Sequence, residues 1–319
     1  MVSTINRTEH RILTLIIRTF GEALLTAWAA VTLTFFALRA TSGDPTANLL
    51  AQGLASPQQV ERLRTALFLD QPLFTQYGRF LLGLFKGDLG ISFYTNRSVF
   101  LTLAEQLRPT LELGTLSVLF MFLFASMLGI TAAWWHGKPA GRFASRMADV
   151  LTTLPVALVG LLFLYIFSVI RQHSTRPGGF NPYSLLLPAV VLGFSLSGGV
   201  ARILKSSLRE VLKKPYILAA RARGLRKNGR LLWFALRPAL PPAVSLSALE
   251  IAYVFSGTVV TETLFGRPGL GRLLVSSILQ SDFPVAQGVI TLAALFYTLT
   301  HFLARILILL IDPRLRGEP

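Results

Sequence analysis

Six long apolar stretches constrain the fold of this 319-residue chain more than any other feature. A helix needs about 20 predominantly apolar residues to cross the roughly 30 Å of hydrocarbon in a bilayer. Charged residues make up only 14% of the chain, whereas a soluble domain carries about 25% because water wets its surface. The pattern predicts an all-α membrane protein with six transmembrane helices. The predicted spans are Thr19–Arg39, Leu111–Trp135, Val150–Ile170, Leu185–Ile203, Val244–Glu262 and Val285–Ile311.

The distribution of basic residues predicts how these helices are oriented. If the N-terminus is cytoplasmic, the cytoplasmic segments hold 19 of the 31 Lys and Arg residues and the extracytoplasmic segments hold 10. Because loops rich in Lys and Arg stay on the cytoplasmic side, we expect both termini in the cytoplasm. The expected divisions are a cytoplasmic segment at 1–18, a first span at 19–39, an extracytoplasmic segment at 40–110, a core of five spans at 111–311 that includes a cytoplasmic loop at 204–240, and a cytoplasmic tail at 312–319.

The extracytoplasmic segment at 40–110 has the pattern of a small folded cap. Apolar residues recur at helical spacing twice within Ser56–Phe85, which predicts two short amphipathic helices. Gly87–Gly90 then favours a turn, and the β-rich Ile91–Tyr94 favours a short extended piece. We therefore expect an ordered segment, although it is too short to count as an independent domain.

The cytoplasmic loop carries the densest charge in the chain. Arg202–Arg237 contains eleven basic residues and one acid, Glu210. Attraction to anionic membrane lipid would account for the charge alone. Nucleic acid is not expected as a partner of this loop.

Small residues in the same loop favour a third interpretation, docking to another protein. A short helix is predicted to begin after Pro215, and Gly224 is predicted to end it, because glycine readily takes the left-handed conformation that terminates many helices. Three alanines, at positions 219, 220 and 222, give this helix a narrow surface. Such a surface suits a groove in a partner.

Motifs from Gly43 to Arg314 resemble one family of transporters. Tyr216–Leu225 is similar to the cytoplasmic loop of binding-protein-dependent ABC importer permeases, in which Glu-Ala-Ala and three variable residues precede a glycine. Ala219, Ala220 and Gly224 match this pattern, and Leu218 replaces the Glu. The chain is thus similar to the dipeptide, oligopeptide and nickel permeases. Other similar segments, in the family's order, are Gly43–Pro45, Leu69–Pro72, Gly87–Ser92, Pro109–Leu113, Glu262–Phe265, Pro268–Arg272, Asp282–Val285 and Asp312–Arg314.

The resemblance implies a type I-like permease that forms one half of a translocation pathway in the bacterial inner membrane. The implied partners are a second homologous permease, two cytoplasmic ATP-binding subunits and an extracytoplasmic substrate-binding protein, with no cofactor. The helix within 215–225 would enter a cleft of the ATPase and convert its closure into rocking of the spans. The implied coupling residues are Tyr216, Ala219, Ala220, Ala222, Gly224 and Leu225.

The sequence contains no catalytic motif. A G-x-x-x-x-G-K-[ST] phosphate loop is absent, so we expect ATP hydrolysis in a partner and no enzymatic activity in this chain. The four histidines are scattered and lack metal-ligand spacing, so no metal site is expected. The alternative function is an ion-coupled secondary transporter that acts without an ATPase.

Two acidic residues in predicted spans are candidates for the translocation path, since intramembrane charge is costly and often functional. Glu250 would face the path and meet a cationic group, or else be a neutralised packing residue. Glu262 matches the family motif near an outer span end, where a structural role is the simpler interpretation. The expected substrates are short peptides, nickel or other metal chelates.

Overall fold

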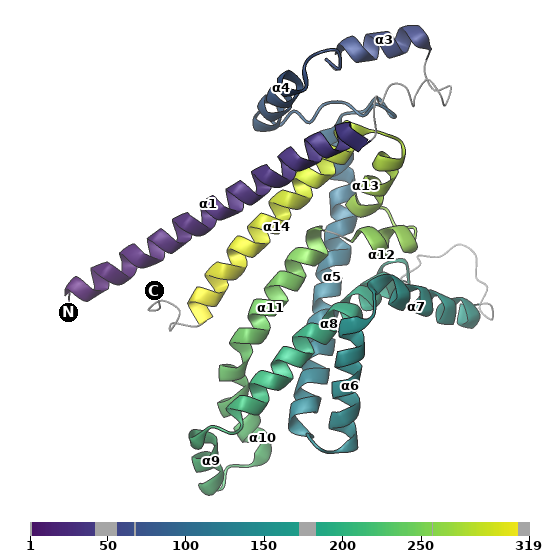
Figure 1. The fold of residues 1–319 in the computed structure, drawn as a ribbon. Coiled ribbons are helices and arrows are strands. Elements are labelled where there is room, and N and C mark those ends of the chain that lie inside the picture. Colours follow the sequence, from purple (N-terminus) through teal and green to yellow (C-terminus); the bar gives the residue numbers. More distant parts are fainter. Residues whose placement is uncertain (1, 42–55, 67, 172–182, 257, 312–319) are drawn as a thin grey trace. The chain divides into compact units, whose positions relative to one another are not determined.

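The computed structural model describes residues 2–41, 56–66, 68–171, 183–256 and 258–311. Among them there is no β-strand, only an isolated bridge between Ile91 and Ser98. The predicted all-α fold is confirmed (Figure 1). The helices are α1 (Val2–Thr41), α3 (Pro57–Ala66), α4 (Leu73–Phe85), α5 (Val99–Trp134), α6 (Pro139–Thr153), α7 (Val156–Arg171), α8 (Tyr183–Val211), α9 (Pro215–Ala222), α10 (Lys227–Gly229), the π-helix η1 (Arg230–Ala235), α11 (Leu236–Ser256), α12 (Val259–Leu264), α13 (Leu270–Leu279) and α14 (Phe283–Ile311).

The chain divides into two compact units. Unit 1 comprises Met1–Ala23, Glu112–Phe255 and Tyr297–Pro319, and unit 2 comprises Leu24–Leu111 and Ser256–Phe296. Each unit therefore combines segments that are far apart in sequence, and α1, α5 and α14 contribute to both. The motifs predicted at 43–45 and 312–314, and the tail at 312–319, lie outside the described residues.

The core of unit 1 is built around α8, which packs against α6 and α7. Small residues let membrane helices approach one another closely. A Cβ on Gly198 of α8 would lie only 2.8 Å from the carbonyl oxygen of Ala148 on α6, so this position requires glycine. Buried apolar residues of α5, α6, α8 and α11 form one continuous core, which includes Met121, Leu151 and Leu208.

Four helices in the described part of the chain are long and apolar enough to cross a membrane. They are Ile17–Ala40 within α1, Val99–Trp134, Leu185–Val211 within α8 and Phe283–Leu303 within α14. A fifth crossing is present if α6 and α7 together form one bent span. The number of six spans stays a prediction, because α11 is not among these helices.

The third predicted span, Val150–Ile170, is wrong as a single helix. α6 ends at Thr153, α7 begins at Val156, and the two helices are bent by 112°. Leu154 between them is extended, with φ −80° and ψ 129°. The ring of Pro155 explains this conformation, because a proline clashes with a helical residue before it. Hydropathy stays high across the break, so the apolar pattern did not reveal it.

The fifth predicted span, Val244–Glu262, is also wrong as a single helix. α11 ends at Ser256, and the separate α12 begins after Thr258. Glu262 therefore lies on α12 in unit 2, whereas Glu250 lies on α11 in unit 1. The two acidic candidates consequently belong to different units.

Unit 2 contains the two short helices predicted within Ser56–Phe85, which are confirmed as α3 and α4. Its largest core joins α5, α13 and α14 through Val99, Leu270, Val285 and Val289. Side chains from both sequence segments of unit 2 therefore pack together.

A buried polar contact also links the turn after α4 to the start of α14. The carboxylate of Asp282 accepts hydrogen bonds from the hydroxyl of Ser92 (2.5 Å) and from the backbone N–H of Phe93 (3.1 Å). Asp282 and Ser92 are both buried. Two segments that match the family motifs are therefore joined directly, 190 residues apart in sequence.

Candidate functional site

The predicted coupling segment folds as α9, which begins at Pro215. Proline suits the first helical turn because its φ is fixed near the helical value and the N–H it lacks would be unpaired there. Gly224 follows the helix with a φ of 80°. The N–H of Leu225 donates to the carbonyl of Ala220 (3.2 Å), and the N–H of Gly224 donates to that of Arg221 (3.0 Å). These bonds form a Schellman cap, and the helix end predicted at Gly224 is confirmed.

The predicted coupling residues divide between two faces of α9. Ala220 is buried, and so is Ile217, which belongs to the core of unit 1. The helix packs against η1. A partner can therefore reach the outward alanines but not the side chain of Ala220. Tyr216, Ala219, Ala222 and Gly224 are exposed, and Leu225 is partly exposed.

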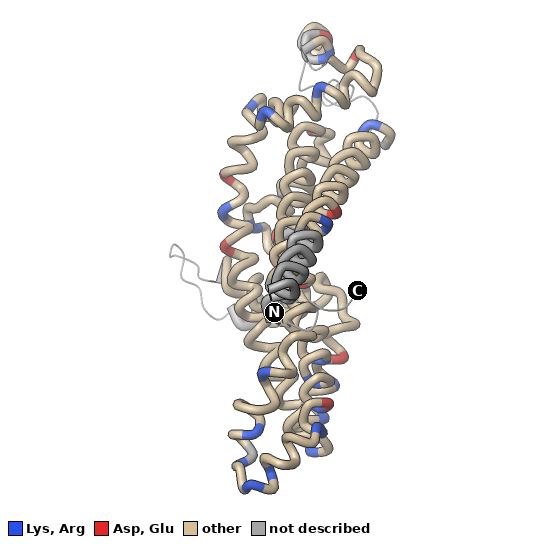
Figure 2. Tube along the Cα trace, turned by 90° about the vertical axis from the view of Figure 1, so that its left-hand side faces the viewer, with Lys and Arg blue, Asp and Glu red and all other residues tan. Residues whose placement is uncertain are grey.

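Basic side chains surround α9. Within unit 1, Lys and Arg gather at the end that carries α9 and α10 (Figure 2). Lys214 pairs with Glu210 at 3.1 Å, but both side chains are exposed, so the pair adds little stability. The surface is thus a positively charged face with a small-residue helix on it. The exposed basic residues beside α9 are Lys213, Lys214, Arg221, Arg223 and Arg226.

Sequence reasoning missed η1, the π-helix that packs beside α9. Trp233 on η1 is 81% exposed, and its neighbour Phe234 is also exposed. Segments of π-helix are rare and occur frequently at functional sites. Tryptophan favours surfaces where an apolar and a wet environment meet. The adjacent aromatic pair in an otherwise basic loop was the signal that could have identified it.

Glu250 lies in the last half of α11, within unit 1, and is half-buried. Its carboxylate is next to α8, since a Cβ on Gly199 would lie 3.6 Å from its Oε1 atom. No hydrogen bond or ion pair to Glu250 occurs among the residues that the structure describes. A carboxyl group with unused acceptor capacity can accept hydrogen bonds from a ligand.

Glu262 is fully buried and holds the start of α13. Its Oε2 atom accepts hydrogen bonds from the backbone N–H groups of Gly271 (2.7 Å) and Arg272 (3.1 Å). Its Oε1 atom accepts from the hydroxyls of Thr110 (2.7 Å) and Thr258. A carboxylate is stabilised at the N-terminus of a helix, where the N–H groups are unpaired and the dipole is positive. These contacts favour a structural role for Glu262.

The glycines of the segment Pro268–Arg272 make room for this carboxylate. A Cβ on Gly269 would lie 2.2 Å from the Cδ atom of Glu262, and a Cβ on Gly271 would lie 2.5 Å from the Cα atom of Val259. The sequence identified this segment only as a match to a family motif. It could not find the contact, because the partners are spread over α5, α12 and α13.

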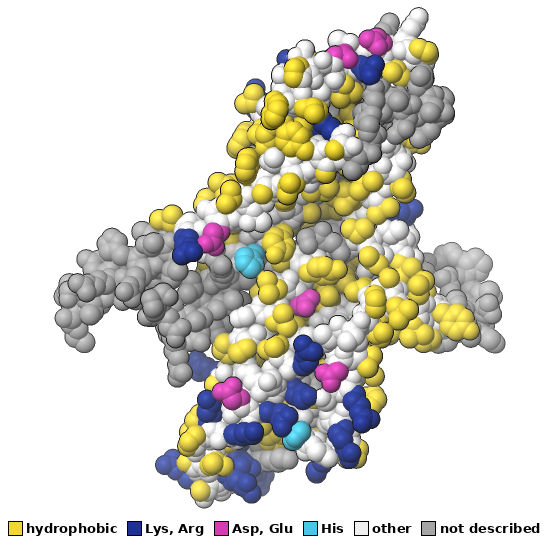
Figure 3. Space-filling model, viewed as in Figure 1, with side chains coloured by type: hydrophobic (Ala, Val, Ile, Leu, Met, Phe, Trp, Pro, Cys, Tyr) yellow, Lys and Arg dark blue, Asp and Glu magenta, His cyan; other side chains and the backbone are white. Residues whose placement is uncertain are grey.

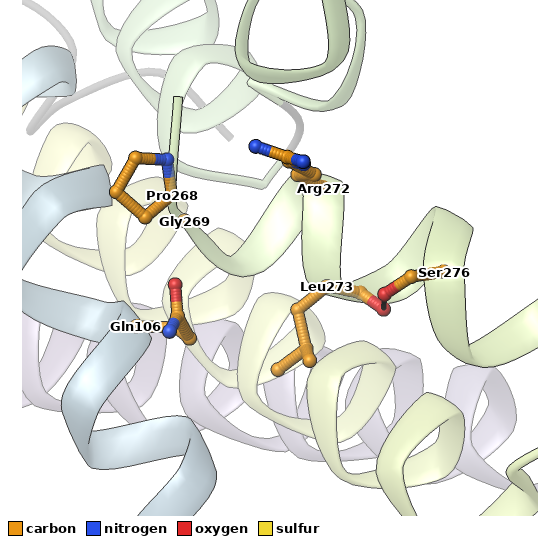
Figure 4. A pocket seen from close by; sticks show the side chains of 6 residues that line it. All are labelled: Gln106, Pro268, Gly269, Arg272, Leu273 and Ser276. Carbon is orange, nitrogen blue, oxygen red and sulfur yellow. Dashed lines mark hydrogen bonds between the residues drawn. The ribbon is translucent and has the colours of Figure 1, made fainter. Parts of the chain in front are cut away.

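A small pocket of about 210 Å³ lies beside the start of α13. Gln106 of α5 faces Pro268 and Gly269, and Arg272 and Leu273 project from different sides of the first turn of α13 (Figure 4). The guanidinium of Arg272 donates to the carbonyl of Gly266 at 2.6 Å. Across the described residues, no three His, Asp or Glu side chains cluster closely enough to hold a metal ion.

Two family models match the chain. The model described as "binding-protein-dependent transport system inner membrane component" covers residues 125–317. The model for the N-terminal part of such membrane components covers residues 12–114. Together they include α9, Glu250 and Glu262.

Similar proteins include the glutathione transport system permease protein GsiC of Salmonella paratyphi A. It is 33% identical over 284 residues, which cover 89% of this chain and 92% of GsiC. GsiC of Escherichia coli K12 is 32% identical over the same length. Among solved structures, a chain of the methionine ABC transporter MetNI in an inward-facing conformation aligns with a TM-score of 0.55 and 18% identity, over 66% of this chain and 96% of that chain. This last likeness shows a shared fold.

Proposed function

The chain belongs to the family of binding-protein-dependent transport system inner membrane components, and from this premise we propose that it forms one half of the translocation pathway of an importer of short peptides. It is a permease subunit of an ABC importer. A second homologous permease would form the other half, and an extracytoplasmic binding protein would deliver the substrate. ATP hydrolysis would take place in two cytoplasmic subunits, with no catalysis in this chain.

Coupling to those ATPases would occur through α9. The observation that supports this proposal is a short, firmly capped helix with small exposed side chains, Ala219 and Ala222, on a strongly basic face. The buried Ile217 and Ala220 connect α9 to the core of unit 1, so a push on the helix would be transmitted to the bundle. Rigid-body motion of packed helices between two states is a common switching mechanism.

Short peptides are the proposed substrates because relatives that are 32–33% identical over 89% of this chain are named as glutathione permeases. Nickel and other metal chelates are alternatives within the wider class. Glu250 would line the path and bind a cationic group such as a peptide amino terminus. A half-buried carboxylate without a protein partner among the described residues supports that role.

The proposed topology places both termini in the cytoplasm. The basic loop at 204–240 would then face the ATPases, and 40–110 would lie on the outer side of the membrane. The excess of Lys and Arg at the α9 end of unit 1 supports this orientation. Anionic lipid at the inner surface would contribute to holding that end.

Purification of the tagged chain from its native membranes in mild detergent tests the function. We expect a second permease and two ATP-binding subunits to co-purify. In proteoliposomes, we expect the complex to transport short peptides only when ATP is present on the side of the membrane that carries the ATP-binding subunits. Uptake driven by an ion gradient, by this chain without any ATPase, would instead establish a secondary transporter.

A further inference from the structure

Helix α4 presents an apolar stripe to the surroundings of unit 2. Phe74 and Phe85 are 80% and 86% exposed, and Leu82 between them is also exposed. These residues lie on one side of the helix, since they are eight and three positions apart. The space-filling view shows hydrophobic side chains gathered over α4 (Figure 3). Large exposed aromatic groups of this kind mark a surface that contacts something other than water.

The opposite side of α4 is fixed against the last turns of α1, within the same unit. Tyr77 Oη lies 2.6 Å from Thr32 Oγ1, and the ring of Phe80 stacks on Phe35 with centroids 5.4 Å apart. Gln76 of α4 accepts a hydrogen bond of 3.0 Å from Arg39. Thr32 precedes Arg39, the charged residue that ends the uncharged run of α1, by seven residues. At 1.5 Å per residue, α4 thus reaches about 10 Å inward from that end.

The charges on α1 determine how deep this contact lies. Its uncharged run, Ala23–Leu38, is sixteen residues long, or about 24 Å, and the hydrocarbon is roughly 30 Å thick. Glu22 and Arg39 bound the run. A shift of α1 along the membrane normal would therefore move one of these charged residues deeper into the hydrocarbon. Thr32 and Phe35 must therefore lie at the level of the lipid tails, and the side chains of α4 that touch them must lie near the same level.

A basic edge borders the apolar stripe. Arg79 and Lys86 are three positions before and four positions after Leu82, so the three side chains are neighbours on the helix surface. The guanidinium of Arg79 lies 3.6 Å over the ring of Phe68, which fixes its position. No acidic residue occurs within α4. Basic side chains beside an apolar stripe match the phosphates and the acyl chains of a phospholipid surface.

We propose that α4 is an interfacial helix that inserts Phe74, Leu82 and Phe85 into the lipid leaflet at the C-terminal end of α1 and places Arg79 and Lys86 among the phosphates. The segment after the first span is then partly immersed in lipid and does not form a cap surrounded by water. Under the proposed topology this leaflet is the extracytoplasmic one. The inference depends on the geometry of α1 and α4 and not on the transported substrate.

The absence of cysteine from the chain allows a direct test with single cysteines. Phe74→Cys and Phe85→Cys would be labelled with a fluorescent probe in the assembled importer, reconstituted in vesicles of phosphatidylethanolamine and phosphatidylglycerol with brominated acyl chains. Leu33→Cys, 70% exposed on α1, is the lipid control, and Glu61→Cys, exposed on α3, is the water control.

We expect the brominated chains to quench both α4 probes, as they quench the probe at position 33, and to leave the probe at position 61 unquenched. We also expect the unlabelled α4 cysteines to react poorly with a membrane-impermeant maleimide, in contrast to the cysteine at position 61. Behaviour like that of Glu61→Cys would overturn the proposal. It would also fail if the two α4 cysteines react freely in the chain alone and become protected only when the second permease or the binding protein is added. Melting temperatures equal to that of the parent would show that each variant is folded.

Discussion

The carboxylate of Glu262 accepts a 2.7 Å hydrogen bond from the hydroxyl of Thr110, a residue that precedes it by 152 positions. Thr110 Oγ1 in turn accepts a 2.8 Å hydrogen bond from the backbone N–H of Leu270. One hydroxyl therefore connects α5 to the acid on α12 and to the start of α13. All three groups are buried, so the loss of this hydroxyl leaves polar atoms without water to replace it.

Replacement of Thr110 by Val tests this connection. The shape is retained but the hydroxyl is lost, so we expect a loss of about 1–3 kcal/mol in stability, the usual cost of an unsatisfied buried polar group. Thr110→Ser keeps the hydroxyl and serves as the control. In thermal unfolding in detergent, we expect the parent to have the highest melting temperature, Thr110→Ser a lower one and Thr110→Val the lowest. An equal melting temperature for Val and Ser would contradict the role of the hydroxyl.

The glycines at the start of α13 should not tolerate a methyl group. Gly269→Ala would place a Cβ against the carboxylate of Glu262, and Gly271→Ala would place one against the backbone of Val259. Overpacking of this kind costs about 1–3 kcal/mol. Gly78→Ala on α4 is the matched control, because nothing lies within 4 Å of its added Cβ. We expect both α13 variants, but not the control, to melt at a lower temperature.

Position 224, where the backbone of Gly224 is in the left-handed conformation, should not tolerate a β-branched side chain. Gly224→Val forces a residue with a Cβ into a φ of 80°, which costs about 1–2 kcal/mol and would disrupt the Schellman cap of α9. We expect peptide uptake and co-purification of the ATPases to fall about 5- to 30-fold, since 1.4 kcal/mol corresponds to a factor of ten. Gly224→Asn, which tolerates this conformation, should retain most activity. Full transport by the Val variant would exclude the proposed coupling through α9.

Substitutions of two neighbouring alanines on α9 should affect stability and ATPase binding separately. Ala220 is buried, so Ala220→Leu should lower the melting temperature through overpacking by about 1–3 kcal/mol. Ala219 is exposed, and Ala219→Leu should leave stability within about 0.5 kcal/mol of the parent while weakening ATPase binding. Melting curves and pull-down of the ATPase distinguish the two. If Ala219→Leu binds the ATPase normally, the outward face of α9 is not the docking surface.

Removal of the charge at Glu250 tests its place in the path. Glu250→Gln retains the size of the side chain, and we expect an unchanged melting temperature but slower uptake of peptides with a free amino terminus. A hydrogen bond to a charged group is worth about 1.5–3 kcal/mol, so the loss should exceed about tenfold. Uptake of an N-acetylated peptide is the internal control. An unchanged ratio of the two rates would remove Glu250 from the path.

Local signals in the sequence predicted local structure well. Pro215 and Gly224 predicted the two ends of α9, because each residue restricts or permits particular backbone angles regardless of its surroundings. The apolar spacing within Ser56–Phe85 predicted α3 and α4, since a short amphipathic helix must bury one side. The resemblance of the ordered motifs identified the family, which the family models and the GsiC relatives confirm.

Features that depend on distant contacts could not be predicted in this way. The breaks in the predicted spans were missed for a different reason. Hydropathy averages over a window, so it passed over the 112° bend at Leu154, although the neighbouring Pro155 is a local signal for it, and over the end of α11 at Ser256. The role of Glu262 depends on groups from α5 and α13, and α9 packs against η1, which sequence reasoning missed. None of these neighbours is adjacent in sequence. A single sequence without its fold therefore shows which residues are unusual but not what they touch.

The link between Ser92 and Asp282 has a consequence for how the protein is made. A ribosome adds roughly 5–20 residues per second, so the 190 residues between the two partners take about 10–40 s to emerge. During that interval the hydroxyl of Ser92 and the N–H of Phe93 lack the acceptor that they have in the finished protein, and Thr110 likewise waits for Glu262. Unit 2 is therefore completed only after α14 has begun to leave the ribosome, and a chain interrupted before that point would present an unfinished unit 2 to quality-control proteases.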